Sequence, residues 1–171
     1  MSRDQARRAG GFLRTAQSGS RLELGNGWMI EIVFDRAHLV RATIDPSGGL
    51  NGLRVEGNAG DGELGCWRLS WRSEKAPPLQ ERDGLSAWFI PQALEVRPWA
   101  AGDKVHPLGG RGRRLVVRCF QDARVARHRR VGWPMVVNPA GEIIWVPGVC
   151  RSNRLVPAAG AEALRVDAQV V

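Results

Sequence analysis

Short stretches in which apolar and polar residues alternate, separated by turns rich in Gly and Pro, constrain the fold of this chain most strongly. The clearest stretch runs from Cys66 to Arg72, where two tryptophans and a leucine alternate with arginine and serine. Alternation with a period of two is typical of a strand that buries one face and exposes the other. The 21 Gly and 10 Pro follow no period, so they predict many short elements joined by turns.

The same pattern predicts further short strands along the chain. A Gly-Asn-Gly turn at 25–27, between alternating residues, predicts a hairpin, and Asn138 to Gly141 predicts a second hairpin between strands at 135–137 and 142–146. We expect a polar loop over 58–65 and a turn over 45–49. The remaining strands are expected at 38–44, 50–55, 87–90, 93–97 and 164–170.

Two helices complete the predicted fold, which is therefore of the α+β class. Residues 2–17 place apolar side chains near one helical face, and Ser2 with Gln5 matches a capping box. Residues 113–121 carry an apolar stripe opposite arginines, although the two valines of this stretch also suit a strand. The residues expected to be buried in that stripe are Leu115, Val116, Cys119 and Phe120.

The positive charge of the chain is concentrated between Arg97 and Arg130. This segment holds ten basic and two acidic residues, a net charge of 10 − 2 = +8, which equals the formal charge of the whole chain. Residues 1–96 carry twelve basic and twelve acidic residues, and residues 131–171 carry three of each. Such concentration predicts a surface that meets a polyanion. The alternative is an Arg-rich solvated surface without a partner.

Several other classes of site are disfavoured by the residue spacing. The three cysteines and three histidines are far apart and fit neither a disulfide framework nor a zinc site. Ser47-Gly48-Gly49 is followed by no helical pattern, so it predicts a turn rather than a phosphate loop. We therefore expect no catalytic, metal or cofactor residue in this chain. No apolar stretch has the length of a membrane span or signal peptide, which predicts a cytoplasmic protein with reduced thiols.

Structured RNA is the polyanion that this sequence favours. Nine of the ten cations in the segment are arginines, whose planar guanidinium suits phosphate. No long helix is predicted to enter a DNA major groove, whereas RNA is often recognised by shape and backbone. Exposed tryptophans could stack on bases, but Trp67, Trp71 and Trp145 lie in apolar patterns that predict core positions. The arginines expected to contact RNA are Arg111, Arg113, Arg114, Arg118, Arg124, Arg127, Arg129 and Arg130.

One segment resembles a known family. Val96 to Lys104, VRPWAAGDK, and the following Pro107-Leu108-Gly109 resemble a signature in the C-terminal domain of bacterial tRNA(Ile)-lysidine synthetases, R-x-W/R-x-x-G-D-[RK]-x-x-P-L-G. The similarity continues at 112–114, 120–122, 125–127, 130, 134–137 and 142–149. The chain departs from the family at Leu115 and Val117, where basic residues are usual, and at Ala126, where Pro is frequent.

The residue pattern and the resemblance together predict an N-terminal helix (1–19), a β-rich linker or substrate-binding segment (20–92) and, as the resemblance implies, a compact α+β tRNA-binding domain (93–171). It also implies tRNA processing: the family enzyme uses ATP and Mg to adenylate the wobble cytidine of tRNA(Ile) and attaches lysine. That chemistry belongs to a PP-loop domain with an S-G-G-x-D-S motif, which is absent from this sequence. The chain is thus expected to recognise the tRNA body and acceptor stem, to be inactive alone, and to partner a PP-loop domain in cis or in trans.

Other functions stay open from the sequence alone. The chain could be a stand-alone module that binds structured RNA or docks an acidic protein, without an enzymatic role. It could also hold an active site of its own, supported only by scattered titratable residues. The sequence predicts no membrane partner, and it leaves the oligomeric state open, a homodimer included.

Overall fold

A computed structural model describes residues 3–41, 51–81 and 83–171 of the chain. The chain divides into two compact units. The first comprises Met1–Asp45 with Ala126–His128, and the second comprises Pro46–Val125 with Arg129–Val171. Each unit has its own hydrophobic core.

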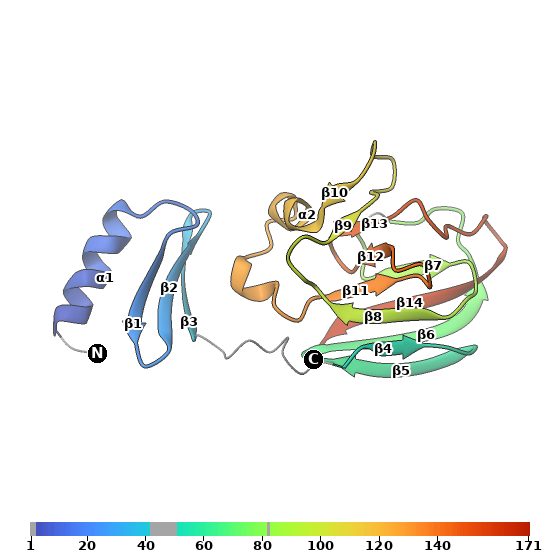
Figure 1. The fold of residues 1–171 in the computed structure, drawn as a ribbon, viewed down its shortest axis with the longest axis horizontal. Coiled ribbons are helices and arrows are strands. Elements are labelled where there is room, and N and C mark those ends of the chain that lie inside the picture. The colour runs from blue at the N-terminus through green and yellow to red at the C-terminus, as the bar shows by residue number, and fades with distance from the viewer. Residues whose placement is uncertain (1–2, 42–50, 82) are drawn as a thin grey trace. The chain divides into compact units, whose positions relative to one another are not determined.

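The first unit packs one helix on a small antiparallel sheet (Figure 1). Its elements are α1 (Arg3–Thr15), β1 (Arg21–Gly25), β2 (Trp28–Val33) and β3 (Arg36–Arg41), with the strands in the order β1-β2-β3. The core joins Ala9 of the helix to Ile30 and Ile32 of the central strand, with Phe12 packed against them. The two isoleucines are two residues apart, so they share the face of the sheet that meets α1.

The second unit contains a four-stranded antiparallel sheet in the order β5-β6-β14-β7. The central pair, β6 and β14, aligns nine residues from Trp67↔Val170 to Lys75↔Glu162. Along β6, Trp67, Leu69 and Trp71 are buried while the arginines between them are exposed, as the alternation predicts. The strands are β5 (Ala59–Leu64), β6 (Trp67–Lys75), β7 (Ser86–Phe89) and β14 (Glu162–Val170).

A second sheet of seven strands lies in the same unit, in the order β10-β9-β12-β11-β8-β4, with β13 paired to β12. Its centre, β11 and β12, is buried at every residue. The pairing of β9 with β12 is parallel, and the other pairs are antiparallel. The strands are β4 (Leu53–Val55), β8 (Leu94–Pro98), β9 (Lys104–Val105), β10 (Arg114–Leu115), β11 (Pro134–Val137), β12 (Ile143–Val146) and β13 (Cys150–Arg151).

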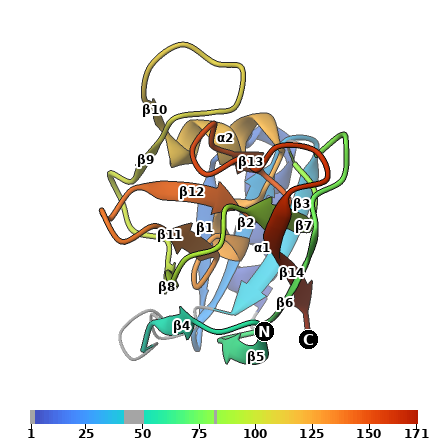
Figure 2. The same ribbon diagram turned by 90° about the vertical axis from the view of Figure 1, so that its right-hand side faces the viewer.

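Two short helices interrupt the strands between β10 and β11. They are α2 (Val116–Asp122) and a 3-10 helix, η2 (Arg127–Arg129). The loop between β9 and β10 stands out from the sheets near α2 (Figure 2). No helix in the described part of the chain is long and apolar enough to cross a membrane.

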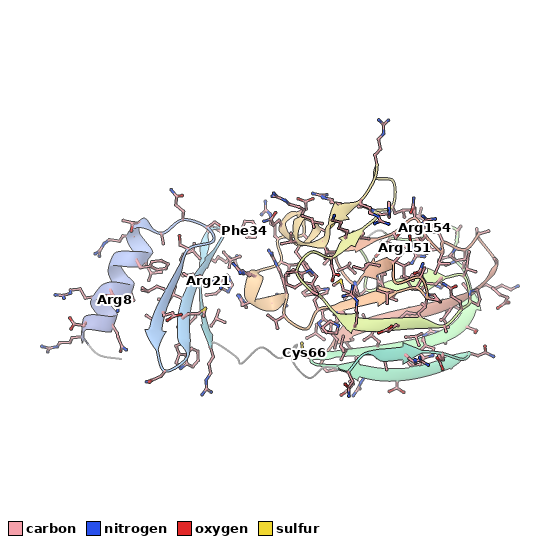
Figure 3. All side chains as sticks on the ribbon, in the orientation of Figure 1. Arg8, Arg21, Phe34, Cys66, Arg151 and Arg154 are labelled. Atoms are coloured by element: carbon pink, nitrogen blue, oxygen red, sulfur yellow. The ribbon has the colours of Figure 1, made fainter. Side chains whose placement is uncertain are left out.

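A buried arginine links the two sheets of the second unit. Arg151, on β13, is 1% exposed, donates from Nη2 to the Trp88 carbonyl of β7, and stacks its guanidinium 4.5 Å from the centre of the Phe89 ring (Figure 3). Nε and Nη1 have no hydrogen-bond partner within the described residues. Burial lowers the pKa of Arg151 to about 10, because a cation is poorly solvated in the core.

The α+β class and most of the predicted strands are confirmed, and the β11–β12 hairpin lies where the Asn-Pro-Ala-Gly turn predicts it. The predicted loop over 58–65 was wrong, since these residues contain β5. A Cβ on Gly60 would lie 2.5 Å from Cζ2 of Trp71, and one on Gly62 would overlap Leu53. These glycines therefore permit close packing and do not mark a loop.

The predicted helix over 113–121 was wrong in its first turn. Arg114 and Leu115 pair with β9, and the helix begins only at Val116. Leu115 is 38% exposed and leaves the apolar stripe, whereas Val116, Cys119 and Phe120 are buried as expected. The turn at 45–49 and the capping residue Ser2 lie outside the described residues. The domain boundaries after 19 and 92 stay predictions.

Candidate nucleic-acid interface

The basic segment of the second unit is held by Asp103. Its two carboxylate oxygens accept hydrogen bonds from Arg97 at 2.7 and 2.9 Å, and Oδ2 also accepts from the Ala100 amide at 2.9 Å. Its carbonyl accepts from the amide of Val116, the first residue of α2, at 2.9 Å. The hydrogen bonds to Asp103 are the main reason why the pKa of Arg97 is raised. One residue thus joins the end of β8, a Gly-Asp turn and the start of α2.

The buried side of α2 belongs to an aromatic cluster. Phe120 is fully buried and makes edge-on contacts with Trp99 at 5.6 Å and Trp133 at 5.4 Å between ring centres. Trp133 in turn lies 4.8 Å from Trp67 of β6. The rings come from β6, from α2 and from the residues next to β8 and β11, so the helix that carries Arg118 is fixed on the core.

The arginines expected to contact RNA are exposed, with Arg130 the exception. Three of them have a side-chain partner. Arg113 donates from Nε to Nε2 of His106 at 3.0 Å, and Arg118 donates to Gln121 at 3.2 Å. Arg114 forms an ion pair with Asp122 at 2.6 Å, with roughly half of each side chain exposed. An exposed ion pair in water is weak, so a phosphate can compete for this guanidinium.

Arg130 differs from the others because it packs into the fold. Its Nε and Nη2 donate to the Val125 carbonyl at 3.0 and 2.7 Å, and its guanidinium lies 5.5 Å from the centre of the Phe120 ring. This side chain closes the turn after α2, where Arg124 has φ +53°. Arg130 therefore stabilises the turn after α2, and its role in RNA binding stays a prediction.

The remaining predicted contact residues lie on loops and the 3-10 helix. Arg111 is in the β9–β10 loop between Gly109 and Gly112, which both have φ +72°. Arg127 and Arg129 belong to η2, and Arg127 falls in the first unit. The structure therefore gathers Arg111, Arg113, Arg114, Arg118, Arg124 and Arg129 on the second unit and assigns Arg127 to the first.

Two cysteines meet beside this segment. The thiol of Cys150 hydrogen-bonds to Cys119, and this bond, helped by the charge of Arg114, lowers the pKa of Cys119 to about 7 against the opposing effect of burial. The pKa of Cys150 is raised by the same bond and by burial. All three cysteines are free thiols. Within residues 3–41, 51–81 and 83–171, no three metal-ligating side chains are placed to hold an ion.

Sequence reasoning missed the partners of the arginines. His106, Gln121 and Asp122 fix or neutralise guanidinium groups, but each is unremarkable in the sequence. Arg114 lies on β10 and Asp122 ends α2, so the fold brings the two side chains together and their spacing in the sequence does not show it. Trp67, Trp71 and Trp145 are core residues as predicted, whereas Trp28 is 41% exposed and was not singled out.

Residues 94–168 match the family model of the TilS substrate C-terminal domain. The resemblance predicted from the segment 96–149 is thereby confirmed. A solved structure entitled "Crystal structure of TILS C-terminal domain" has a similar fold, with a TM-score of 0.58 at 22% identity over 71% of this chain and 98% of that chain.

Curated relatives extend the similarity beyond residues 94–168. A tRNA(Ile)-lysidine synthase of Shouchella clausii (strain KSM-K16) is 29% identical over 154 residues, which are 88% of this chain and 32% of that protein. One from Symbiobacterium thermophilum is 40% identical over 79 residues, 45% of this chain and 16% of that protein. The chain thus spans about a third of the length of the first relative and less of the second.

Proposed function

We propose that this chain is the tRNA-recognition portion of a tRNA(Ile)-lysidine synthetase. The observation that carries the proposal is the exposed arginine set of residues 111–129 on or beside a TilS substrate C-terminal domain. The proposed role of residues 93–171 is to bind the body and acceptor stem of tRNA(Ile). A PP-loop domain, in cis or in trans, would supply the ATP- and Mg-dependent ligation of lysine in the cytoplasm.

Phosphate binding follows from the way the arginines are mounted. Asp103 and Phe120 fix the β9–β10 region and α2, so that the guanidinium groups project from a rigid base. Rigid mounting lowers the entropy lost on binding. Arg113 and Arg118 donate to a ring nitrogen of His106 and the amide oxygen of Gln121, and neither partner is a carboxylate, so both guanidinium groups keep their positive charge for a phosphate.

A matched pair of double variants tests this surface. Arg113→Ala with Arg114→Ala should weaken binding to tRNA on the order of tenfold or more at about 0.1 M salt, because two phosphate contacts are lost. The control is Arg54→Ala with Arg68→Ala, which removes the same charge from exposed ion pairs elsewhere on the second unit. Fluorescence anisotropy with labelled tRNA measures both affinities. Equal losses in the two variants would mean that only net charge matters and would refute a specific surface.

Catalysis is tested separately. Incubation of this chain with ATP, lysine and tRNA should yield lysidine only when a protein with an S-G-G-x-D-S domain is added. Lysidine formed by the chain alone would place an active site within it. Competition between tRNA and an acidic protein for the same arginines would instead support the docking alternative.

A further inference from the structure

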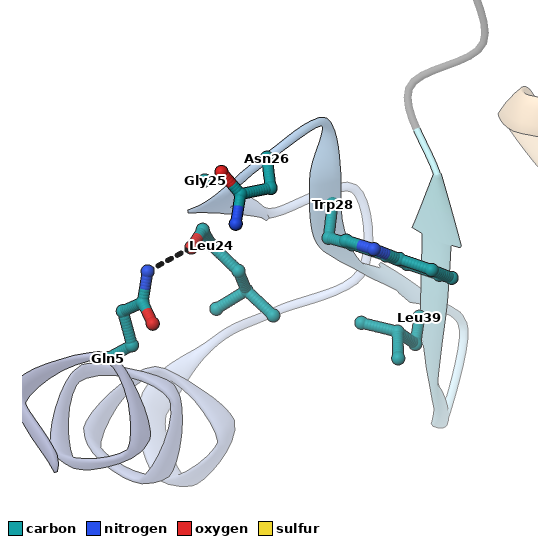
Figure 4. Close-up of a pocket in the computed structure, with 6 residues that line it drawn as sticks. All are labelled: Gln5, Leu24, Gly25, Asn26, Trp28 and Leu39. Carbon is teal, nitrogen blue, oxygen red and sulfur yellow. Dashed lines mark hydrogen bonds between the residues drawn. The ribbon is translucent and has the colours of Figure 1, made fainter. Parts of the chain in front are cut away.

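The first unit contains a pocket at one end of its sheet (Figure 4). Its volume is about 340 Å³, which lies within the usual range for small-ligand sites. It opens where α1, the β1–β2 turn and the edge strand β3 come together. The lining residues are Gln5, Leu24, Gly25, Asn26, Trp28 and Leu39.

The walls of the pocket are apolar side chains that the core leaves uncovered. Trp28 continues the face of β2 that carries Ile30 and Ile32, which are both 8% exposed beneath α1. Trp28 itself is 41% exposed and Leu39, on the neighbouring strand, is 62% exposed. A large indole beside an exposed leucine is an unusual surface for a small unit, and such patches commonly bind a partner.

The rim of the pocket is polar and uncharged. Asn26 lies in the turn with φ +51°, a conformation that asparagine tolerates, and its amide offers both a donor and an acceptor. Gln5 donates from Nε2 to the Leu24 carbonyl at 2.6 Å, which joins α1 to β1 across the pocket (Figure 4). No carboxylate is among the lining residues. The combination suits a flat ligand with an aromatic face and a hydrogen-bonding edge.

An arginine lies beside the pocket, and the unit that contains the pocket carries a net positive charge. Arg41 lies directly opposite Trp28 in the β2–β3 register, so the two side chains share one face of the sheet. The described residues 3–41 carry seven arginines against four acidic residues, a net charge of 7 − 4 = +3. An apolar peptide would gain little from this charge, whereas a nucleotide carries both a flat base and a phosphate.

We propose that this pocket binds an unpaired nucleobase of an RNA strand. The base stacks on Trp28, its edge hydrogen-bonds to Asn26, and Arg41 meets the adjacent phosphate. The inference rests on the proposed function, because tRNA supplies unpaired bases in its loops. It adds a second contact, outside the TilS domain, that reads a base and not only the backbone.

Substitution of Trp28 tests the stacking contact. Trp28→Ala should lower affinity for an RNA stem-loop at least fivefold, roughly the smallest effect expected for one stacked base. Trp28→Phe should recover most of the affinity because it keeps an aromatic face. Leu13→Ala is the control, since Leu13 is 48% exposed on α1 but does not line the pocket. Fully paired RNA should bind wild type and Trp28→Ala equally.

A base analogue reports the same contact without relying on the alanine variant. Stem-loops with 2-aminopurine at single loop positions should lose fluorescence on binding wild type or Trp28→Phe at one position, because stacking quenches the analogue. Circular dichroism shows whether Trp28→Ala unfolds the first unit. If it does, the fluorescence of the analogue bound to wild type, Trp28→Phe and Leu13→Ala tests the stacking contact instead. Absence of quenching at every loop position overturns the proposal. Quenching of free 2-aminopurine riboside alone would show a nucleoside site and also overturn it.

The two proposals fail in different ways. If Arg113→Ala with Arg114→Ala weakens tRNA binding but Trp28→Ala and the analogue show no effect, the base pocket is wrong and the proposed function stands. If wild type binds neither tRNA nor stem-loop, both are wrong.

Discussion

Phe120→Ala is expected to be the most damaging single substitution in the second unit. Phe120 is 0% exposed, and truncating a buried Phe to Ala costs about 3–5 kcal/mol. The edge-on contacts with Trp99 and Trp133 add to the loss, since aromatic pairs contribute roughly 0.5–1.5 kcal/mol beyond burial. We therefore expect a loss near the upper end, about 4–5 kcal/mol. Domains are stable by only about 5–15 kcal/mol, so the variant should be close to unfolding.

The matched control is Leu115→Ala in the same segment. Leu115 is 38% exposed, so this substitution should cost no more than about 0.5 kcal/mol. Guanidinium unfolding, followed by the near-ultraviolet circular dichroism of the aromatic cluster, compares the midpoints of wild type and both variants. A helix that began at Arg113 would bury both side chains and make both substitutions costly. Similar losses in the two variants would therefore refute the observed start of α2 at Val116.

Three further substitutions test the polar contacts of the second unit. Asp103→Asn should lower the free energy of unfolding by about 2 kcal/mol, because it unpairs the half-buried Arg97. Asp122→Asn should lower it by under about 1 kcal/mol, because its ion pair with Arg114 is exposed. Thermal unfolding measures both losses, and equal losses would count against the role of Asp103 in holding β8 and α2 together. Burial tends to raise the pKa of Glu74, but hydrogen bonds from Trp88 and Arg72 and the charge of Arg165 lower it below 4.5. The ionised Glu74 carboxylate therefore stabilises the fold above pH 4.5, and this stabilisation is lost as the pH falls through the native pKa. Glu74→Gln should make the free energy of unfolding depend less on pH in the acid range. An unchanged pH dependence would exclude this contribution.

Much of the fold could be predicted because alternation reports burial directly. The strand at Cys66 to Arg72 and the hairpin around Asn138 lie where the sequence places them, since one face of each strand needs apolar residues and each tight turn needs Gly or Asn. The strand β5 was not predicted because its glycines serve long-range packing. Gly60 faces Trp71, which is eleven residues away in the chain and belongs to another strand.

Contacts between distant segments explain the other differences. Arg151 is among the largest fully buried side chains, although an arginine is ordinarily predicted to be exposed. Its burial depends on the Trp88 carbonyl at the edge of β7, which is 63 residues away and could not be inferred from local pattern. Leu115 likewise lies outside the helix because its backbone pairs with Lys104 of β9.

The candidate interface could be located but not resolved in detail from the sequence. The charge concentration and the Gly-Asp signature point to one segment, and Asp103 forms the turn that the signature implies. The sequence could not show that Arg130 packs on Phe120, or that Arg114 pairs with Asp122. Which side of a guanidinium faces solvent is set by tertiary neighbours, not by the run of arginines.

The salt dependence of tRNA binding tests the central claim most directly. With about five phosphate contacts, a plot of the logarithm of the association constant against the logarithm of salt concentration should have a slope of about −3 to −5. Arg113→Ala with Arg114→Ala should reduce the magnitude of the slope by roughly 1.5, and Arg54→Ala with Arg68→Ala should leave it unchanged. A slope near zero for the wild-type chain would contradict the account.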